Sequence, residues 1–181
     1  GDETDLAELV RIKKQFAKVM LYVDEAHAIG VRGEQGLGCA EQYGVIDDID
    51  LLVGTFGKAL VSVGGYLICH PIIREYLINS MRPLIFSTAQ PPICMAWTDF
   101  IFQKVLTLKN ERQHLNNISQ SLQQAVLNKG FDCPSTSHIV PVIIGESQKT
   151  VDKAMQLQQA GFYIMPVRPP TVPKHSSRLR I

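Results

Sequence analysis

Long apolar runs and an excess of either charge are missing from this sequence. The longest apolar stretches, such as Val19–Val23 and Leu51–Val53, are far too short to span a bilayer, and no signal-peptide pattern opens the chain. The net charge is +1, which gives no electrostatic footprint for nucleic acid or an anionic membrane surface. We therefore expect neither a nucleic-acid partner nor a membrane association.

Paired cysteines are missing as well. Cys39, Cys69, Cys94 and Cys133 are widely spaced and form no CxxC pair, which argues against a zinc site or a disulfide framework. Scattered single cysteines suit a reducing compartment, so we expect a cytoplasmic protein. With 45% hydrophobic and 19% charged residues, the composition is that of an ordinary globular protein.

Hydrophobic spacing predicts helices that alternate with short apolar strands. Leu6, Leu9 and Val10 recur at helical spacing after Thr4, a good N-cap residue, which predicts a helix over about 4–17. The other predicted helices lie near 40–43, 71–81, 92–128 and 147–160, and the predicted strands lie near 19–24, 50–55, 65–69, 139–144 and 162–167.

This alternation indicates an α/β fold with a mostly parallel sheet that is covered on both faces. The long predicted helix 92–128 is expected to link two lobes, with a boundary near 105–110. The sequence ends on RLRI, which is typical of the start of a strand, and it begins just before a helix. We therefore expect it to be part of a longer protein.

Polar side chains follow two of the predicted strands at the point where each strand ends. Asp24 ends LYVD and His27 comes next in the loop, while Thr55 ends LLVGT and Lys58 comes next. Each one alone has an ordinary interpretation as a turn residue, a helix cap or a solvated charge. In open α/β sheets, however, ligands lie beyond the carboxyl ends of the strands, so the four groups could converge on one ligand.

A carboxylate, an imidazole, a hydroxyl and a lysine match the needs of pyridoxal phosphate (PLP). The lysine amine forms a Schiff base, the carboxylate keeps the pyridine nitrogen protonated, and hydroxyls hold the phosphate. A metal site at Asp24, Glu25 and His27 is the competing interpretation, but these side chains point in different directions and no second histidine is spaced to join them. A serine nucleophile is disfavoured because no G-x-S-x-G occurs.

Four segments resemble the α-oxoamine synthases, which are PLP enzymes with the aspartate aminotransferase fold: VDEAHAIGVRGEQGLG, DLLVGTFGKAL followed by GGY, RPLIFSTAQPP, and RPPTVPKHSSRLRI. The resemblance covers essentially the whole chain, yet members of that family are about twice as long. It implies the C-terminal half only, namely part of the PLP-binding large domain (1–105) and part of a small α/β C-terminal domain (106–181). We expect these residues alone to bind cofactor weakly or not at all and to be inactive.

The resemblance also implies roles for the motif residues. Lys58 of GTFGKA would be the catalytic Schiff-base lysine, and Asp24 of VDEAH would pair with the pyridinium nitrogen. His27, also expected to be catalytic, would bond the phenolic oxygen of the cofactor. Thr55 would bind the phosphate.

Three further residues carry implied roles at the edges of the site. Ser87 and Thr88 of FSTA would reach the phosphate of the partner subunit, since family sites lie at a homodimer interface. Arg180 of RLRI would receive the substrate carboxylate, a bidentate task that suits a guanidinium. Arg178 is the neighbouring alternative, because the two side chains would share one face of a strand. No metal is implied.

The family joins an amino acid to an acyl thioester, with loss of carbon dioxide, to leave an α-amino ketone. The segment RPLIFSTAQPP is most similar to the members that condense L-alanine with a pimeloyl thioester, carried by coenzyme A or a carrier protein, in biotin synthesis. The glycine C-acetyltransferase and serine palmitoyltransferase types remain alternatives, as does a non-catalytic subunit of the same fold. The presence of Lys58 and Asp24 favours catalysis.

Two residues depart from the family pattern. The family usually has glycine where His175 stands in PTVPKHSSR, and often has glycine where Val61 follows GKAL. His175 could alter how the substrate is accommodated, or it could simply replace a permissive turn residue.

Overall fold

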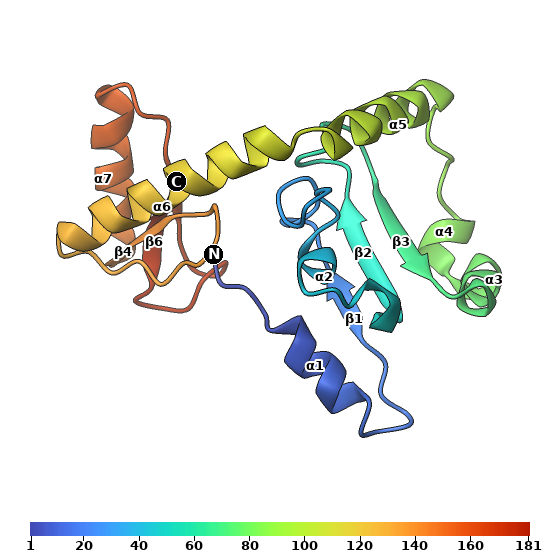
Figure 1. Ribbon diagram of the computed structural model, residues 1–181. Helices are drawn as coiled ribbons and strands as arrows, with labels where there is room; N and C mark the ends of the chain where they lie inside the picture. The colour runs from blue at the N-terminus through green and yellow to red at the C-terminus, as the bar shows by residue number, and fades with distance from the viewer. The chain divides into compact units, whose positions relative to one another are not determined.

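A computed structural model describes all residues, Gly1–Ile181, as two compact units. One unit comprises Asp5–Arg112, and the other comprises Gly1–Thr4 together with Gln113–Ile181. In chain order the elements are α1 (Leu6–Lys13), β1 (Tyr22–Asp24), α2 (Cys39–Gln42), the 3-10 turn η1 (Ile46–Asp48), β2 (Leu51–Thr55), β3 (Gly65–Cys69), α3 (Pro71–Ser80), α4 (Arg82–Ile85), α5 (Pro92–Leu106), α6 (Lys109–Asn128), β4 (Pro141–Gly145), α7 (Ser147–Gln159), β5 (Met165–Val167) and β6 (Ser177–Arg180) (Figure 1).

The unit Asp5–Arg112 is built on a three-stranded sheet of order β1-β2-β3. β1 and β2 are parallel, with Asp24 opposite Val53, whereas β2 and β3 are antiparallel, with Thr55 opposite Gly65. The carboxyl ends of β1 and β2 therefore lie at the same edge of the sheet.

The expected α/β fold is confirmed, but the expected mostly parallel sheet is wrong. Only β1 and β2 pair in parallel, while β3 and every strand pair of the second sheet are antiparallel. The reason is the length of the connections, since a parallel crossover needs about a dozen or more residues. The segments 56–64 and 168–176 are too short for one. Apolar runs report that a strand is buried, not the direction in which it runs.

The main core of this unit lies on one face of the sheet. Leu6 and Val10, one helical turn apart on α1, pack with Ala40 and Val45 against Leu52 of β2. Residues four apart on a helix share one face, which explains how the short α1 covers the sheet.

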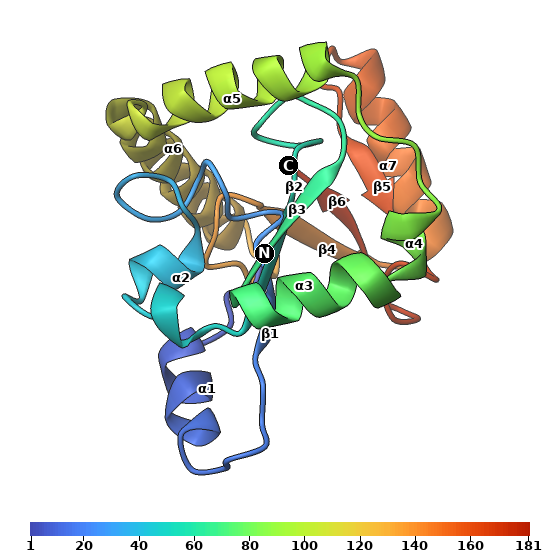
Figure 2. The same cartoon turned by 90° about the vertical axis from the view of Figure 1, so that its right-hand side faces the viewer.

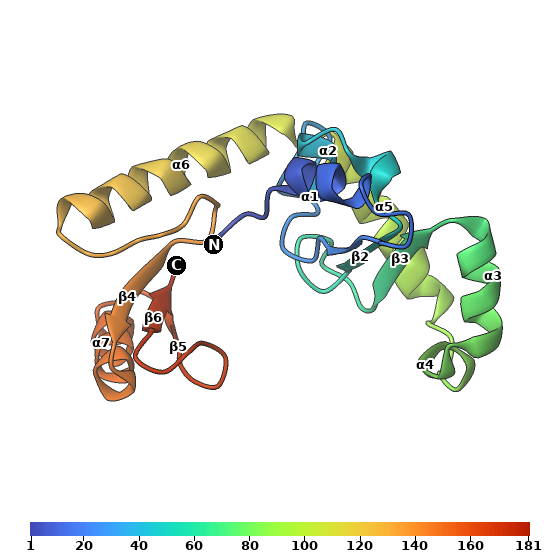
Figure 3. The same cartoon turned by 90° about the horizontal axis from the view of Figure 1, so that it is seen from below.

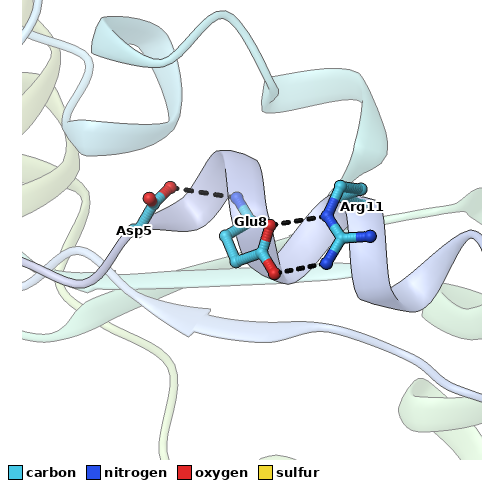
Figure 4. Close-up of polar contacts among 3 residues, drawn as sticks. All are labelled: Asp5, Glu8 and Arg11. Carbon is cyan, nitrogen blue, oxygen red and sulfur yellow. Dashed lines mark hydrogen bonds and ion pairs between the residues drawn. The ribbon is translucent and has the colours of Figure 1, made fainter.

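Helix α1 begins at a different residue from the one predicted. Asp5, not Thr4, is the N-cap, and its Oδ1 accepts a hydrogen bond from the Glu8 backbone N–H at 2.9 Å (Figure 4). Both Glu8 carboxylate oxygens then accept from Arg11, at 2.6 Å each, and this bond lowers the pKa of Glu8. The helix ends at Lys13 rather than near residue 17. The following strand, β1, is also shorter than predicted, since it begins at Tyr22 and not near residue 19.

The predicted helix 92–128 is in fact two helices, α5 and α6, separated at Thr107 and Leu108. Neither residue is a helix breaker, so the local sequence does not predict the break between α5 and α6. Its cause is tertiary, because the buried Arg112 guanidinium donates to the Val105 carbonyl oxygen at 2.7 Å and to the Glu34 carbonyl oxygen at 2.6 Å. Arg112 thus caps the end of α5 and ties it to the glycine-rich loop.

The second unit holds a three-stranded antiparallel sheet of order β4-β6-β5. Figure 3 shows α7 beside this sheet, and Ala154 of α7 packs with Val142 of β4 and Leu179 of β6 to form its core. Ser147 and the buried Ser177 share a hydrogen bond of 3.1 Å that ties the start of α7 to β6. The observed β4 and β5 agree in place with the predicted strands, but β5 is shorter than predicted.

Two non-glycine residues have positive φ angles, Val61 at 46° and His175 at 62°. These are the two positions at which the sequence has another residue where the α-oxoamine synthases that it resembles usually or often have glycine. The left-handed region costs an L-residue roughly 1–2 kcal/mol. His175 therefore occupies a turn position suited to glycine, which supports the interpretation that it replaces a permissive turn residue.

We expect the substitution His175→Gly to stabilise the protein by about 0.5 kcal/mol, because glycine adopts a positive φ without strain. The gain is small because glycine also makes the unfolded chain more flexible, which offsets part of the relieved strain. Urea denaturation of the full-length protein measures the change. Lys174→Gly is the matched control, since Lys174 does not have a positive φ and can only lose stability. A His175→Gly variant as unstable as Lys174→Gly would contradict the expectation.

Candidate active site

The two predicted cofactor ligands at strand ends share one face of the sheet. Asp24 lies opposite Val53 in the β1–β2 register, and Thr55 lies two residues beyond Val53. Because side chains alternate along a strand, Asp24, Val53 and Thr55 point to the same side. Val23 and Leu52 point to the other side, into the core. The face that carries Asp24 and Thr55 is thus opposite the α1–α2 core.

Lys58 lies in the connection from β2 to β3, which the backbone closes into a compact loop. Phe56 N–H donates to the Gly64 carbonyl oxygen at 2.9 Å, and Ser62 N–H donates to the Phe56 carbonyl oxygen at 2.8 Å. Lys58 itself is exposed, whereas Leu60, two residues on, is 1% exposed and packs on Ile29 and Val105. The loop is therefore anchored in the unit while the amine of Lys58 lies at the surface.

The Thr55 hydroxyl already has two partners. It accepts the Gly57 N–H at 3.1 Å and donates to the Gly64 carbonyl oxygen at 3.2 Å. A hydroxyl has one proton, so Thr55 must leave Gly64 in order to donate to a phosphate oxygen. The carboxylate of Asp24 accepts the Ala26 N–H through Oδ1 at 2.8 Å and keeps a second oxygen for further bonds. An exposed amine, a carboxylate and a hydroxyl at one sheet edge suit the donor set of a PLP site.

The turn after β1 contains His27, which is exposed, and Glu25, which is buried. Glu25 accepts the Cys39 N–H at 3.0 Å and the Ala40 N–H at 2.6 Å. These are the first backbone N–H groups of α2, whose N-cap Gly38 offers no side chain. Glu25 thus caps α2 from a distance and holds the glycine-rich loop against the turn that carries Asp24 and His27.

Replacing Glu25 with glutamine should destabilise the protein by about 1–3 kcal/mol, because the amide NH2 cannot accept and leaves one buried N–H of α2 without its partner. Urea denaturation of the full-length protein measures this. Glu75→Gln, at an exposed carboxylate of α3, is the matched control and should change nothing measurable. Equal stability of the two variants would show that Glu25 does not support α2.

Tyr66, in the GGY segment of β3, is the residue with the most perturbed pKa. Burial, followed by the charges of Glu25 and Asp24, raises the pKa of Tyr66 from 10.0 to about 12. Its hydroxyl is buried without a hydrogen-bond partner, and its ring lies directly over Gly54, where a Cβ would come within 2.4 Å of it. Only glycine at position 54 leaves room for this ring.

The raised pKa of Tyr66 predicts a loss of stability at alkaline pH. Between pH 10 and about 12 the folded state keeps the phenolic proton that the unfolded state has lost, so stability falls as pH rises through this window. Unfolding measured at pH 9 and pH 11 should show a smaller fall in Tyr66→Phe than in the unmodified protein. Tyr163→Phe, at a side chain that is 85% exposed, should follow the unmodified protein. An unchanged fall in Tyr66→Phe would contradict the prediction.

The remaining predicted residues lie elsewhere. Ser87 and Thr88 are exposed in the segment between α4 and α5, and the Ser87 hydroxyl donates to the Pro83 carbonyl oxygen. Arg180 is exposed at the end of β6, in the other compact unit. Arg178 is on the same face of β6, but its Nε donates to the Ser176 carbonyl oxygen at 2.9 Å. The structure leaves the assigned roles of these four residues as predictions.

An apolar cavity of about 380 Å³ lies against the Lys58 loop. Phe56 and Leu60 of the loop line it, together with Tyr66 of β3 and Thr98 and Phe102 of α5. The sequence pattern gave no role beside the Lys58 loop to Tyr66 or α5, and it suggested Glu25 only as a metal ligand and not as the cap of α2. The motifs VDEAH and GGY contain Glu25 and Tyr66, but their burial was not visible from spacing.

The structure groups no three histidine, cysteine, aspartate or glutamate side chains that could hold a metal ion. None of its helices combines the length and the hydropathy needed to cross a membrane.

Curated relatives and solved structures match the whole chain. An 8-amino-7-oxononanoate synthase of Haemophilus ducreyi is 56% identical over 184 residues, and a Pasteurella multocida protein provisionally given the same name is 58% identical over 181 residues. The alignments cover 99% of this chain and 48% and 47% of those relatives, respectively. The chain thus spans about half the length of the curated relatives it matches.

The fold matches a solved variant of serine palmitoyltransferase from S. paucimobilis, described as holding a bound PLP–myriocin aldimine. The TM-score is 0.91 at 30% identity, and the match covers 99% of this chain and 46% of that one. The family model of aminotransferase class I and II matches residues 1–181. Because that match extends over every residue, the chain belongs to the aminotransferase class I and II family.

Proposed function

We propose that the full-length protein is an 8-amino-7-oxononanoate synthase, a PLP-dependent acyltransferase that condenses L-alanine with a pimeloyl thioester in biotin synthesis. The observation that carries the proposal is the placement of Asp24, Thr55 and the Lys58 loop at one edge of the sheet, in a chain 56% identical to a synthase of that name. The 181 residues would supply about half of that enzyme, and the half alone would be inactive.

PLP, when bound, supplies an electron sink for negative charge at the α-carbon of the amino acid. Lys58 would hold the cofactor through its Nζ and, once displaced, would take the α-proton of the substrate. The exposed position of Lys58 on a loop closed by Phe56 and Gly64 supports both tasks, since the amine is accessible while its backbone is held.

Asp24, His27 and Thr55 would orient the cofactor. The Asp24 carboxylate would keep the pyridine nitrogen protonated, and His27 would bond the phenolic oxygen. Thr55 would donate to the phosphate after exchanging its bond to Gly64, which is a modest cost because one hydrogen bond replaces another.

The other site residues would serve substrate binding and assembly. Arg180 would receive the substrate carboxylate with its guanidinium fork, and Ser87 and Thr88 would reach the phosphate of the partner subunit in a homodimer. We also propose that 1–105 and 106–181 are parts of the PLP-binding and the small domain. The four free cysteines suit a cytoplasmic protein.

The test uses the full-length protein, purified with PLP, with Lys58→Ala compared against Lys18→Ala, an exposed lysine on the α1–β1 connection. Loss of Lys58 should remove the visible absorption band of the bound cofactor and lower turnover by about a thousandfold or more. Lys18→Ala should keep both. Adding L-alanine, but not glycine, should shift the band.

A band that is unchanged in Lys58→Ala, or that never forms, would end the catalytic proposal and favour a non-catalytic subunit of the same fold. A shift with glycine in place of L-alanine would favour a glycine C-acetyltransferase type, and a shift with L-serine would favour a serine palmitoyltransferase type.

A further inference from the structure

The loop that carries Lys58 contains a strained residue. Val61 has a φ of 46°, and its side chain is 66% exposed, so no burial of the side chain compensates for the strain. A β-branched residue in this region is strained and persists only where the surroundings hold it. Val61 N–H donates to the Lys58 carbonyl oxygen at 3.0 Å, so the strained residue closes the turn that begins at Lys58.

Helix α5 holds this turn through two neighbouring side chains. Trp97 Nε1–H donates to the Val61 carbonyl oxygen at 2.8 Å, and the hydroxyls of Ser62 and Thr98 are 2.7 Å apart. Figures 1 and 2 show α5 running beside the β2–β3 connection. Adjacent residues of the helix thus hold adjacent residues of the loop.

The hydrogen bonds of Thr98 decide which of the two hydroxyls, Ser62 or Thr98, is the donor in the bond between them. Thr98 is 6% exposed, and its hydroxyl donates to the Cys94 carbonyl oxygen at 2.7 Å within α5. Its single proton is therefore in use, so Ser62 must be the donor to Thr98. The Ser62 hydroxyl is fixed by a buried acceptor that is itself fixed by the helix.

A short chain of hydrogen bonds connects α5 to the candidate catalytic lysine. The indole of Trp97 binds the carbonyl of Val61, and the N–H of Val61 binds the carbonyl of Lys58. The Lys58 side chain is exposed. The position of its amine therefore depends on the backbone of this turn.

We propose that Trp97 and Thr98 are positioning residues that hold the strained turn Lys58–Ser62 and thereby fix where the Lys58 amine lies. The inference rests on the proposed function of Lys58 as the residue that carries the cofactor.

The test measures the lysine itself rather than turnover. The full-length protein, stripped of cofactor, is mixed with PLP and reduced with borohydride, and the labelled lysines are quantified by peptide mass spectrometry. The readout is the labelling of Lys58 relative to the exposed Lys18. Trp97→Phe, which keeps a ring but loses the donor, and Thr98→Val, which loses the hydroxyl, should each lower this ratio by about twofold to tenfold, the range for one lost hydrogen bond.

Thr107→Val is the matched control for Thr98→Val. Thr107 also lies at α5, and its hydroxyl donates to a carbonyl of the same helix, that of Lys104, at 2.8 Å. Its removal should leave the labelling ratio unchanged. A purely structural role of Trp97 or Thr98 would lower the unfolding midpoint without moving the ratio of Lys58 to Lys18.

Val61→Gly provides a second, independent arm. Glycine adopts the positive φ without strain, so the turn no longer needs to be held, and Trp97→Phe should change the labelling ratio less in this background than alone. If Trp97→Phe does not fold, Ser62→Ala removes the neighbouring contact with Thr98 from the loop side and should itself lower the ratio.

The outcomes separate the two proposals. Wild-type protein in which Lys58 is labelled no more than Lys18 would overturn the proposed function and this inference with it. Strong wild-type labelling of Lys58 that is unchanged in Trp97→Phe, Thr98→Val and Ser62→Ala would overturn the positioning role alone.

Discussion

The short connection between β2 and β3 is the constraint on which the candidate site depends. Its ends are joined by the bond from Phe56 N–H to the Gly64 carbonyl oxygen, so β3 must return antiparallel to β2. Because β1 runs parallel to β2, the carboxyl ends of both strands lie at the edge where this connection begins. The position of Lys58 in the loop at the edge where β1 also ends follows from strand direction and loop length, before any side chain is considered.

The two faces of this sheet have separate tasks. One face carries Leu52, Val23 and the ring of Tyr66 into the core formed with α1 and α2. The other face carries Asp24, which keeps a second carboxylate oxygen for further bonds, and Thr55, whose hydroxyl can donate to a ligand only by giving up its bond to Gly64. The alternation of side chains along a strand allows both tasks with only five residues in β2. A polar edge is thus supported by an apolar layer directly behind it.

Strain and burial are concentrated around the same loops. Val61 takes a conformation suited to glycine within the turn Lys58–Ser62, and Glu25 places a buried carboxylate directly after Asp24. Each is compensated by hydrogen bonds from a distant segment, α5 for Val61 and the start of α2 for Glu25. Local costs of this kind are commonly retained at functional sites, where surrounding contacts hold a geometry that the chain would not choose alone.

The sequence by itself determined most of the helices and strands, though not all of their ends, and it determined the strand-end positions of Asp24 and Thr55 and the loop position of Lys58. These follow from periodicities and turn residues that act over a few positions. Only the tertiary structure decided the directions of the strands, the break between α5 and α6 and the burial of Glu25. Each of these depends on partners distant in the chain, as when Arg112 binds the carbonyl of Glu34. Local propensity carries no information about such partners, since folding brings them together.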